Sequence, residues 1–553
     1  MKSEILTLSQ DKIENIKEEL CSVLGYGYKD KIEVKNKTNI DESEVFFDKK
    51  KHKYLFIISN KEEKLLDLEI NLKELSSLTD MDYQIKFEGY RIKFIDSFSE
   101  EKIKIGQNLY FDHCDFKAIK LKNICFENFE INGYRYKSDQ KQSIVFRACE
   151  FKELSLNNSI FSEDIKFEKE TKIKYLHVNL SKFKKYFFIQ NCTIKNISLW
   201  KNKFKNRCYF VDSNFGYKDK VNKAELNFSN AHFENNAYFN NSEFYNYADF
   251  HECEFEKIAC FYGVKFDKTP NFSQAIFKGN LNVVNTNLNF TFDNLEEKIK
   301  QEYGSYKSQR IAKEVGVIPN LYQEKSLDKF ANDFRDSFRN FKSTLIKDNN
   351  LLDASNFHKY ELYCKELELK NKKDKTLKDR IDKWQLSFYR KLCDHHTDIL
   401  QSLNSLILVI GIFVISSVVM VASFNYRLGY KPILEHWYFS LDFYNHHINS
   451  IIQDNYLFVV KVNFAMLFGY LGLVGFALCL KYIREFFIII SYGVTLSVLA
   501  VSPKILIPAM GIFTDKRSML DPLSTIGGIY TIVFGFVVFS FIKTIRKNSI
   551  VPS

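Results

Sequence analysis

Residues 226–280 read LNFSNAHFENN, AYFNNSEFYNY, ADFHECEFEKI, ACFYGVKFDKT and PNFSQAIFKGN when the chain is written in rows of eleven. Phe occupies the third and the eighth place of every row, at Phe228, Phe233, Phe239, Phe244, Phe250, Phe255, Phe261, Phe266, Phe272 and Phe277. This spacing of five and six residues is neither the 3.6 of an amphipathic helix nor the 2 of a half-buried strand. It predicts a coil that turns a corner about every five residues, with these ten rings inside and neighbouring coils stacked on one another.

A small residue stands two places before the second Phe of each row, and the same pairing continues less regularly upstream. Four cysteines outside the rows, Cys114, Cys149, Cys192 and Cys208, occupy this place, as Cys253 does within them. A small apolar thiol suits a tight interior. Because the chain has no CxxC pair, we expect these cysteines to be structural and not to bind a metal.

The strings ACEF (148–151), NCTI (191–194), NAHF (230–233) and ECEF (252–255) place a large apolar residue two positions after a small one. In this respect the chain resembles the pentapeptide-repeat family. The resemblance covers residues 105–292 and implies a right-handed quadrilateral β-helix of about eight coils, at about 4.8 Å per rung. It also implies flat outward ladders that contact a partner.

The charge of this segment bears on the kind of partner. Residues 110–225 carry 23 basic and 14 acidic side chains, and residues 226–290 carry 4 and 7. Some members of the family imitate DNA, which requires a surface dense in carboxylates. The net positive segment argues against such mimicry, and we expect neither that role nor a nucleic-acid partner, since a solvated Lys-rich surface explains the charge.

Beyond residue 402 the composition changes to long apolar runs. They are Leu403–Phe424, Val462–Leu480, Phe486–Val501 and Leu523–Ile542. Their lengths predict four membrane-spanning helices. Basic residues before the first run, between the second and third and after the fourth place both termini in the cytoplasm by the positive-inside rule. No secretory signal is readable at the start of the chain. We therefore expect a multi-pass protein of a bacterial inner membrane, with residues 425–461 and 503–522 outside.

Four domains follow from these observations. Residues 1–104 form an α+β cap, 105–292 the pentapeptide-repeat β-helix, 293–401 a cytoplasmic helical linker, and 402–553 a four-helix transmembrane domain. The linker holds a helical hairpin over residues 331–370, which resembles the helix pair of bacterial membrane-bound pentapeptide-repeat proteins. A basic helix with Trp384 follows and is expected to run along the membrane surface.

Motifs of catalysis are absent from the sequence. It contains no phosphate loop, GxGxxG, HExxH, GxSxG or paired CxxC. The pairs His395-His396 and His446-His447 are poor chelates, because adjacent helical residues point about 100° apart. We expect no enzymatic activity, no cofactor and no metal.

Two functions from different classes agree with this organisation. The first is a non-enzymatic scaffold anchored in the membrane, whose cytoplasmic rod binds an unknown protein partner at the bilayer. The alternative is an oligomeric membrane effector or ion-conducting channel gated by the rod, for example in phage defence. The near absence of charge within the four runs favours the scaffold, since a conducting path often carries buried charge.

Overall fold

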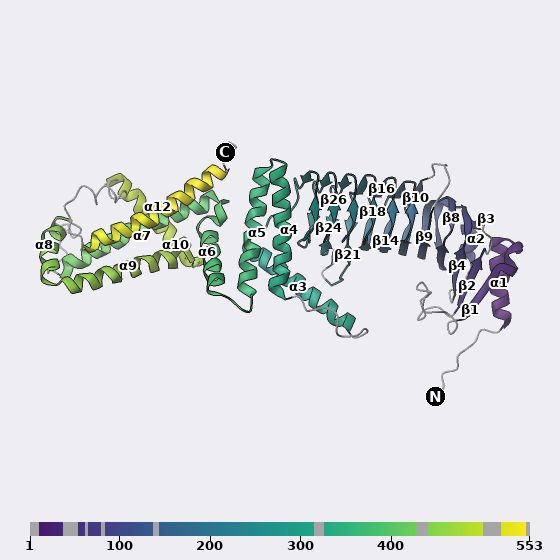
Figure 1. Ribbon diagram of the computed structural model, residues 1–553, viewed down its shortest axis with the longest axis horizontal. Coiled ribbons are helices and arrows are strands. Elements are labelled where there is room, and N and C mark those ends of the chain that lie inside the picture. The colour runs from purple at the N-terminus through teal and green to yellow at the C-terminus, as the bar shows by residue number, and fades with distance from the viewer. Residues whose placement is uncertain are drawn as a thin grey trace, which may run out of the picture. The chain divides into compact units, whose positions relative to one another are not determined.

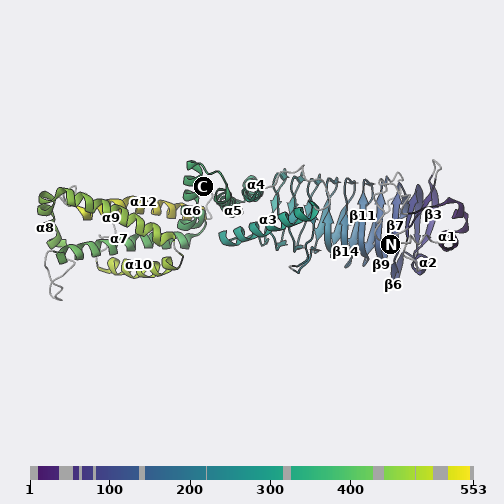
Figure 2. The same cartoon turned by 90° about the horizontal axis from the view of Figure 1, so that it is seen from below.

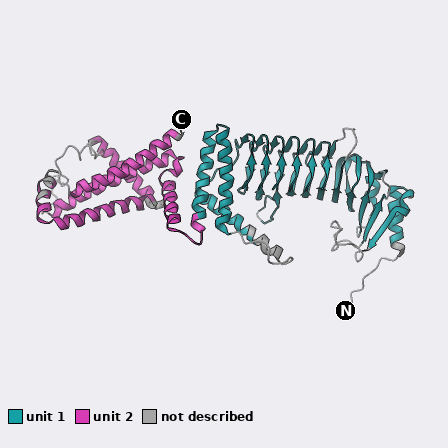
Figure 3. Ribbon diagram, viewed as in Figure 1, with its two compact units in different colours: residues 1–368 teal, residues 369–553 magenta. Residues whose placement is uncertain are grey.

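The computed structural model (Figure 1) describes residues 10–36, 54–60, 65–78, 83–135, 143–219, 221–314, 326–427, 441–479, 481–501 and 521–548. The chain divides into two compact units, residues 1–368 and residues 369–553 (Figure 3). Each unit is described by itself.

The first unit is a parallel β-solenoid of about nine turns with helices at both of its ends. Its largest sheet contains β1 (Ile32–Asn36), β2 (Tyr54–Ser59), β4 (Tyr83–Glu88), β6 (Phe98–Ile105), β7 (Asn108–Asp112), β9 (Lys120–Asn132), β10 (Ile144–Arg147), β11 (Glu150–Asn157), β13 (Ile165–Glu168), β14 (Lys172–His177), β16 (Phe187–Gln190), β17 (Thr193–Ser198), β19 (Cys208–Val211), β20 (Asn214–Phe215), β21 (Leu226–Asn227), β23 (Ala237–Tyr238), β24 (Glu243–Phe244), β25 (Ala248–Asp249), β27 (Ala259–Cys260), β28 (Lys265–Phe266) and β30 (Leu281–Asn282). A second ladder contains β12 (Ile160–Phe161), β15 (Lys182–Phe183), β18 (Lys203–Phe204), β22 (His232–Phe233), β26 (Glu254–Phe255) and β29 (Ile276–Phe277). A third contains β3 (Leu66–Asn71), β5 (Tyr90–Ile95) and β8 (Asp115–Ala118).

The predicted interior rings form continuous stacks along this solenoid. All ten Phe of the rows are buried. Phe233 lies 4.9 Å from Phe255, which lies 5.0 Å from Phe277, with nearly parallel rings. The other seven form three equivalent columns, headed by Phe228, Phe239 and Phe244. Because identical positions stack from turn to turn, each turn buries its rings only against its neighbours.

A left-handed backbone corner recurs every eleven residues and explains how the short strands join. Within the rows it falls on the fifth place, with φ of 55–67°, at Asn230, Asn241, Glu252, Gly263 and Gln274, and it recurs at Asn285. Upstream, the same conformation appears at Ala148, Asn158, Lys169, Leu180, Asn191, Lys201 and Asp212. Asn and Gly tolerate this region best, and the sequence supplies one of them at most of the corners of the regular rows.

Where the small residue before a second ring is Ser or Cys, it has a polar role as well as a steric one. Cys253 Sγ donates to the carbonyl of Phe228, and Ser242 Oγ donates to the carbonyl of Phe210, one turn earlier in both cases. Cys149 Sγ donates in the same way to Leu121. Burial raises the pKa of the Cys149 thiol to about 11. The thiol therefore stays protonated, as a structural group does.

The parallel ladders begin upstream of residue 105. β2 pairs with β4 and β4 with β7 in parallel register, and β3, β5 and β8 form a second parallel ladder. Residues 54–104, which the sequence analysis assigns to a separate cap, thus provide strands that continue the solenoid. Among these early strands, β2 and β4 are six residues long and bury most of their positions, and β5 alternates buried and exposed ones. The five-six rhythm that marks the later turns is therefore missing from their sequence.

The amino-terminal end is covered by α1 (Gln10–Leu24), the 3-10 helix η1 (Tyr26–Lys31) and α2 (Leu72–Ser77). Strand β1 pairs with β2 antiparallel, unlike every other pair of described strands. Leu20, Cys21, Leu72 and Leu75 are buried in the same core as the Phe columns. A covered edge cannot pair with another chain.

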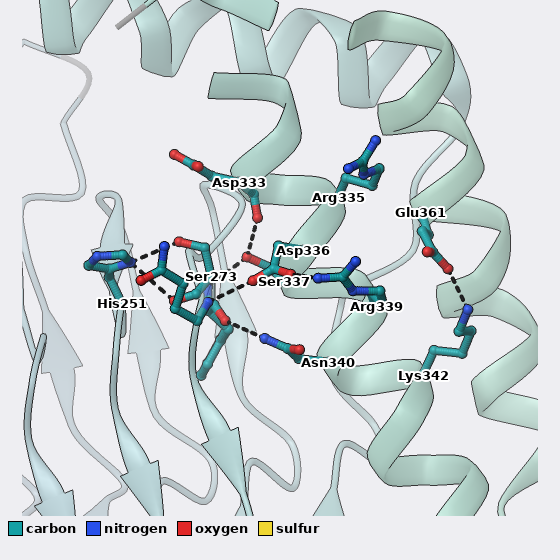
Figure 4. Close-up of polar contacts among 12 residues, drawn as sticks. His251, Ser273, Asp333, Arg335, Asp336, Ser337, Arg339, Asn340, Lys342 and Glu361 are labelled. Atoms are coloured by element: carbon teal, nitrogen blue, oxygen red, sulfur yellow. Dashed lines mark hydrogen bonds and ion pairs between the residues drawn. The ribbon is translucent and has the colours of Figure 1, made fainter. Parts of the chain in front are cut away.

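The carboxyl-terminal end is closed by α4 (Leu327–Lys347), which lies across the last turn (Figure 4). Ser337 Oγ accepts from the amide of Phe272 at 2.8 Å, and Asp336 accepts from the amide of Gln274 at 2.7 Å. Asn340 donates to the carbonyl of Phe272. The Phe341 ring lies 4.7 Å from Phe272, tilted against it, and ends that column. The side chains of α4 therefore provide the hydrogen bonds and the apolar contact that a further turn would have made.

Two more helices complete this unit. They are α3 (Phe292–Glu314) and α5 (Leu351–Asn371). Lys342 on α4 forms an ion pair with Glu361 on α5 at 2.6 Å, and Phe341 packs 5.1 Å from Phe357. Residues 348–350 join the two helices, and α4 and α5 lie side by side (Figure 1).

The second unit consists of helices. They are α6 (Leu377–Cys393), the 3-10 helix η2 (Asp394–His396), α7 (Ile399–Arg427), α8 (Leu441–Asp454), α9 (Tyr456–Cys479), α10 (Lys481–Val501) and α12 (Pro522–Asn548). Helix α7 packs against α9, α10 and α12 (Figure 2). The Phe413 ring lies 4.0 Å from that of Tyr530, and Tyr492 donates to Asn404 Oδ1 at 3.0 Å.

Among the described residues, three helices are long and apolar enough to cross a membrane: Ile399–Arg427, Tyr456–Leu478 and Pro522–Arg546. They contain the first, second and fourth predicted runs, apart from Cys479 and Leu480; Leu480 lies outside the described residues. The third run falls on α10, which is not among the three. Large apolar side chains stay exposed on these helices, including Phe464, Phe468 and Phe539. Exposure of this kind on apolar helices is typical of a membrane protein.

Candidate functional site

One section of the solenoid surface carries charge of a single sign. Between residues 171 and 211 the chain has nine Lys, one Arg and no Asp or Glu. This segment begins at β14 and ends at β19, and so it makes up nearly two consecutive turns. The name basic face is used below for its residues Lys182, Lys184, Lys185, Lys203 and Lys205.

The fold places the lysines of the basic face in columns. Lys182 on β15 and Lys203 on β18 are direct partners in the parallel ladder. The amide of Lys184 donates to the carbonyl of Phe161, and that of Lys205 to Phe183, so these two also stand one turn apart at one position of the coil. Successive rungs are about 4.8 Å apart. Like charges directly opposite in a ladder destabilise a sheet, and the buried Phe183 and Phe204 hold these strands in place regardless.

Few of the ten basic residues have an acidic partner. Lys203 pairs with Glu234 at 2.8 Å, and Lys172 lies 3.7 Å from Glu150. Lys201 lies over the Trp200 ring, and Arg207 is hydrogen-bonded to Tyr209. Within the parts of the chain that the structure describes, Lys182, Lys184, Lys185 and Lys205 form no ion pair. Apart from Lys203, the basic face therefore presents positive charge that the fold itself leaves uncompensated.

A row of outward aromatic rings follows the basic face on the next strands of each turn. Phe188, Tyr209 and Tyr238 are ladder partners on β16, β19 and β23. Their ring centroids are 4.6 and 5.1 Å apart, and the rings are nearly parallel. Lys166 covers the upstream ring at 5.3 Å. Because the faces of these rings are occupied by one another, the row offers ring edges to a partner and little surface on which a nucleobase could stack.

An acidic cluster lies on the ladder of Lys182 and Lys203, on the next strands β22 and β26 toward the carboxyl-terminal end. His232 lies 3.2 Å from Glu256 and 3.5 Å from Glu254. Together, these three residues form the group of potential metal ligands found among the described residues. Lys278 Nζ forms ion pairs with both carboxylates, and its hydrogen bond holds the pKa of Glu256 below its usual range. The ammonium occupies the position that a cation would take, so the cluster is internally compensated.

The histidine pairs lie in the second unit. His395 is buried in η2, and His396 Nδ1 lies 3.4 Å from Cys393 Sγ and 3.3 Å from Thr544 Oγ1. The rings of His446 and His447 on α8 meet edge to face at 4.9 Å. Neither pair belongs to a three-ligand group among the described residues.

The ten predicted Phe are brought together in the interior, where they determine the scaffold and not its surface chemistry. The basic face is the feature that the sequence analysis did not identify. Averaging charge over residues 110–225 hid a 41-residue stretch with no carboxylate. A count over windows of one or two turns reveals it.

Comparisons with protein-family models, with curated proteins and with solved structures find no match to this chain.

Proposed function

We propose that the protein is a non-enzymatic scaffold anchored in a membrane, whose solenoid binds an acidic protein partner through the basic face. One observation supports this most directly. The same chain combines a solenoid surface of uncompensated positive charge with three helices of membrane length. A charged surface of this kind steers an oppositely charged partner and selects against others.

The proposal also assigns the type of solenoid, the role of α4 and α5 and the number of membrane spans. The solenoid is a right-handed, quadrilateral pentapeptide-repeat β-helix, and α4 and α5 are the hairpin that links it to the membrane. Helix α10 is the fourth span, so the bundle crosses an inner membrane four times with both termini in the cytoplasm. The basic residues at the start of α10 and the end of α12 support this orientation.

The test uses the full chain in its native membrane, with a photoreactive group at position 185 to crosslink whatever binds. A variant carrying Lys182→Glu, Lys184→Glu and Lys205→Glu reverses the sign of the charge at three lysines of the basic face that have no ion pair. The matched control carries Lys104→Glu, Lys223→Glu and Lys257→Glu, three exposed lysines elsewhere on the solenoid. We expect a discrete crosslinked protein that disappears in the first variant and persists in the control. Equal crosslinking in the two variants would overturn the proposed face.

The alternative, a conducting oligomer gated by the solenoid, is distinguished by two further measurements. The mass of the detergent-solubilised chain gives its oligomeric state, and planar bilayers give its conductance. A monomer without conductance agrees with the scaffold, whereas a ring of subunits that conducts would replace it.

A further inference from the structure

Helix α6 of the second unit has an apolar face that its own unit leaves uncovered. Leu377, Ile381 and Trp384 follow one another at intervals of four and three residues and therefore share one face of the helix. They are 76%, 54% and 69% exposed. Three large apolar side chains on one helix face form a patch rather than scattered exposure.

The other end of α6 is fixed to the helices of membrane length. Phe388 and Tyr389 each pack 5.9 Å from Phe536 of α12. Gln401 of α7 donates to the carbonyls of Arg390 and Lys391, and Ser405 Oγ donates to that of Leu392. The Trp384 ring stacks on Phe388 at 5.6 Å, which connects the exposed face to this anchored end.

The direction of α6 differs from that of the apolar helices. It runs across them, near the start of α7 and the end of α12 (Figures 1 and 2). Cys393 ends α6, and Asp394, His395 and His396 then take left-handed φ of 47–65°, where the chain turns into α7. A helix that lies across the end of a membrane bundle is parallel to the plane of the bilayer.

The charges around the apolar face are mostly positive and favour an anionic surface. Residues 370–391 contain nine Lys or Arg and three Asp. Lys373, Lys378 and Arg380 are exposed, whereas Asp379 accepts from the Thr376 amide in a capping box and pairs with Lys372 at 2.8 Å. One carboxylate is therefore used inside the segment, and cations prevail beside the apolar face.

We propose that α6 lies in the membrane interface, with Leu377, Ile381 and Trp384 inserted among the lipids and Lys373, Lys378 and Arg380 binding anionic phospholipid headgroups. An apolar face flanked by cations is what an interfacial helix requires. Juxtamembrane Lys and Arg attract an anionic leaflet, and continuity with the membrane-length helices places the bilayer next to α6. This inference rests on the proposed membrane anchoring and adds a lipid-binding surface to it.

Depth-dependent fluorescence quenching tests the insertion. The chain has three Trp, and the substitutions Trp200→Phe and Trp437→Phe leave Trp384 as the single emitter in the full-length protein. The protein is reconstituted into phosphatidylcholine vesicles, with or without phosphatidylglycerol, containing lipids brominated at different acyl depths. We expect blue-shifted Trp384 emission that shallow bromines quench more than deep ones. The matched control keeps Trp200 of the solenoid alone and is expected to lose no emission.

The headgroup contribution is tested by Lys373→Gln, Lys378→Gln and Arg380→Gln in the Trp384 protein. We expect stronger quenching of the parent in vesicles with phosphatidylglycerol and loss of that difference in the triple variant. Quenching that is equal in both lipids and insensitive to the charges would overturn headgroup binding.

Flotation of the same vesicles separates the two proposals. If the chain floats with the vesicles but no bromine quenches Trp384, the apolar face is covered by protein, and the inference fails while the anchoring stands. If the chain does not float with either lipid, the membrane anchoring fails as well.

Discussion

The interior of the solenoid and the interior of the helical unit both contain stacked aromatic rings. The two differ in how far apart in the sequence the stacked rings lie. Phe239 lies 4.8 Å from Phe210 and 4.8 Å from Phe261, the same position of the turns before and after. Phe413 instead stacks on Tyr530, more than a hundred residues away. A repeat fixes the partner of each side chain through its period, whereas helix packing depends on contacts that no local pattern specifies.

The two interiors should therefore respond differently to substitution. In the solenoid, removal of one ring interrupts a column whose members cannot move apart, because the ladder fixes their spacing. In the helical unit, close approach of two helices at one small residue is the sensitive feature. The predictions below test this difference.

The largest effect is expected for Phe239→Ala. The ring is buried between two parallel rings, so its loss leaves a cavity and should lower the free energy of unfolding by about 3–5 kcal/mol. Tyr238→Ala is the matched control, because this neighbour on β23 points outward and stacks on one ring at 5.1 Å. It should cost less than about 1 kcal/mol. Amide hydrogen exchange of the full chain in detergent measures both, and equal losses would contradict the column.

The helical counterpart is Gly411→Ala in α7. A Cβ at this position would overlap Ser491 Oγ and lie 2.6 Å from its Cα, so α7 and α10 must separate. Overpacking of this kind costs about 1–3 kcal/mol. Gly469→Ala in α9 is the control, because its Cβ would meet nothing within 4 Å. A lower thermal midpoint in detergent is expected for the first variant alone, and a shared midpoint would mean that the two helices do not meet there.

The solenoid and the long apolar helices follow from local sequence patterns, whereas contacts between distant segments do not. The period of the rows predicts the solenoid and its interior rings, because each ring is defined by neighbours one turn away. Hydropathy predicts the long apolar helices, because their length is set by the bilayer. The early turns around Phe56 and Phe87 carry no five-six rhythm, since their longer strands β2 and β4 bury most of their residues. The pairing of Gly411 with Ser491 and the columns of the basic face depend on register between distant segments, which a single pattern does not contain.

A pH dependence of intermediate size is expected from Glu130 of β9, which is buried and pairs in the ladder with Tyr110 and Ser155. Burial, together with the negative charges of Glu153 and Asp112, raises the pKa of Glu130 to about 8 from 4.5. Between these values the folded chain holds a proton that the unfolded chain has released. Stability should therefore fall as pH rises through this window, by on the order of 1 kcal/mol per pH unit, and level off above it.

Glu130→Gln removes this titration and should flatten the profile. Hydrogen exchange of β9 and β11 across the window, corrected for the intrinsic exchange rate, measures it. Glu153→Gln serves as the control, since it leaves the Glu130 carboxyl in place and should only lower its pKa and narrow the window. A profile that keeps its slope in Glu130→Gln would assign the dependence to another group.

The smallest effect is a gain of stability at a left-handed corner, and it tests the eleven-residue period itself. Glu252 has φ of 55°, where four of the other five corners from residue 230 to 285 carry Asn or Gly. Its side chain lies 3.4 Å from His251 at an exposed site, a contact that contributes little. Glu252→Asn should therefore stabilise this turn by about 0.5–1 kcal/mol, because Asn tolerates the conformation better. The reciprocal Asn230→Glu should destabilise its turn by a similar amount, as measured by hydrogen exchange of β22 and β26. Stability changes of opposite sign at these two positions, 22 residues apart, would show that the left-handed corner, and not the local contact, determines the preference for Asn.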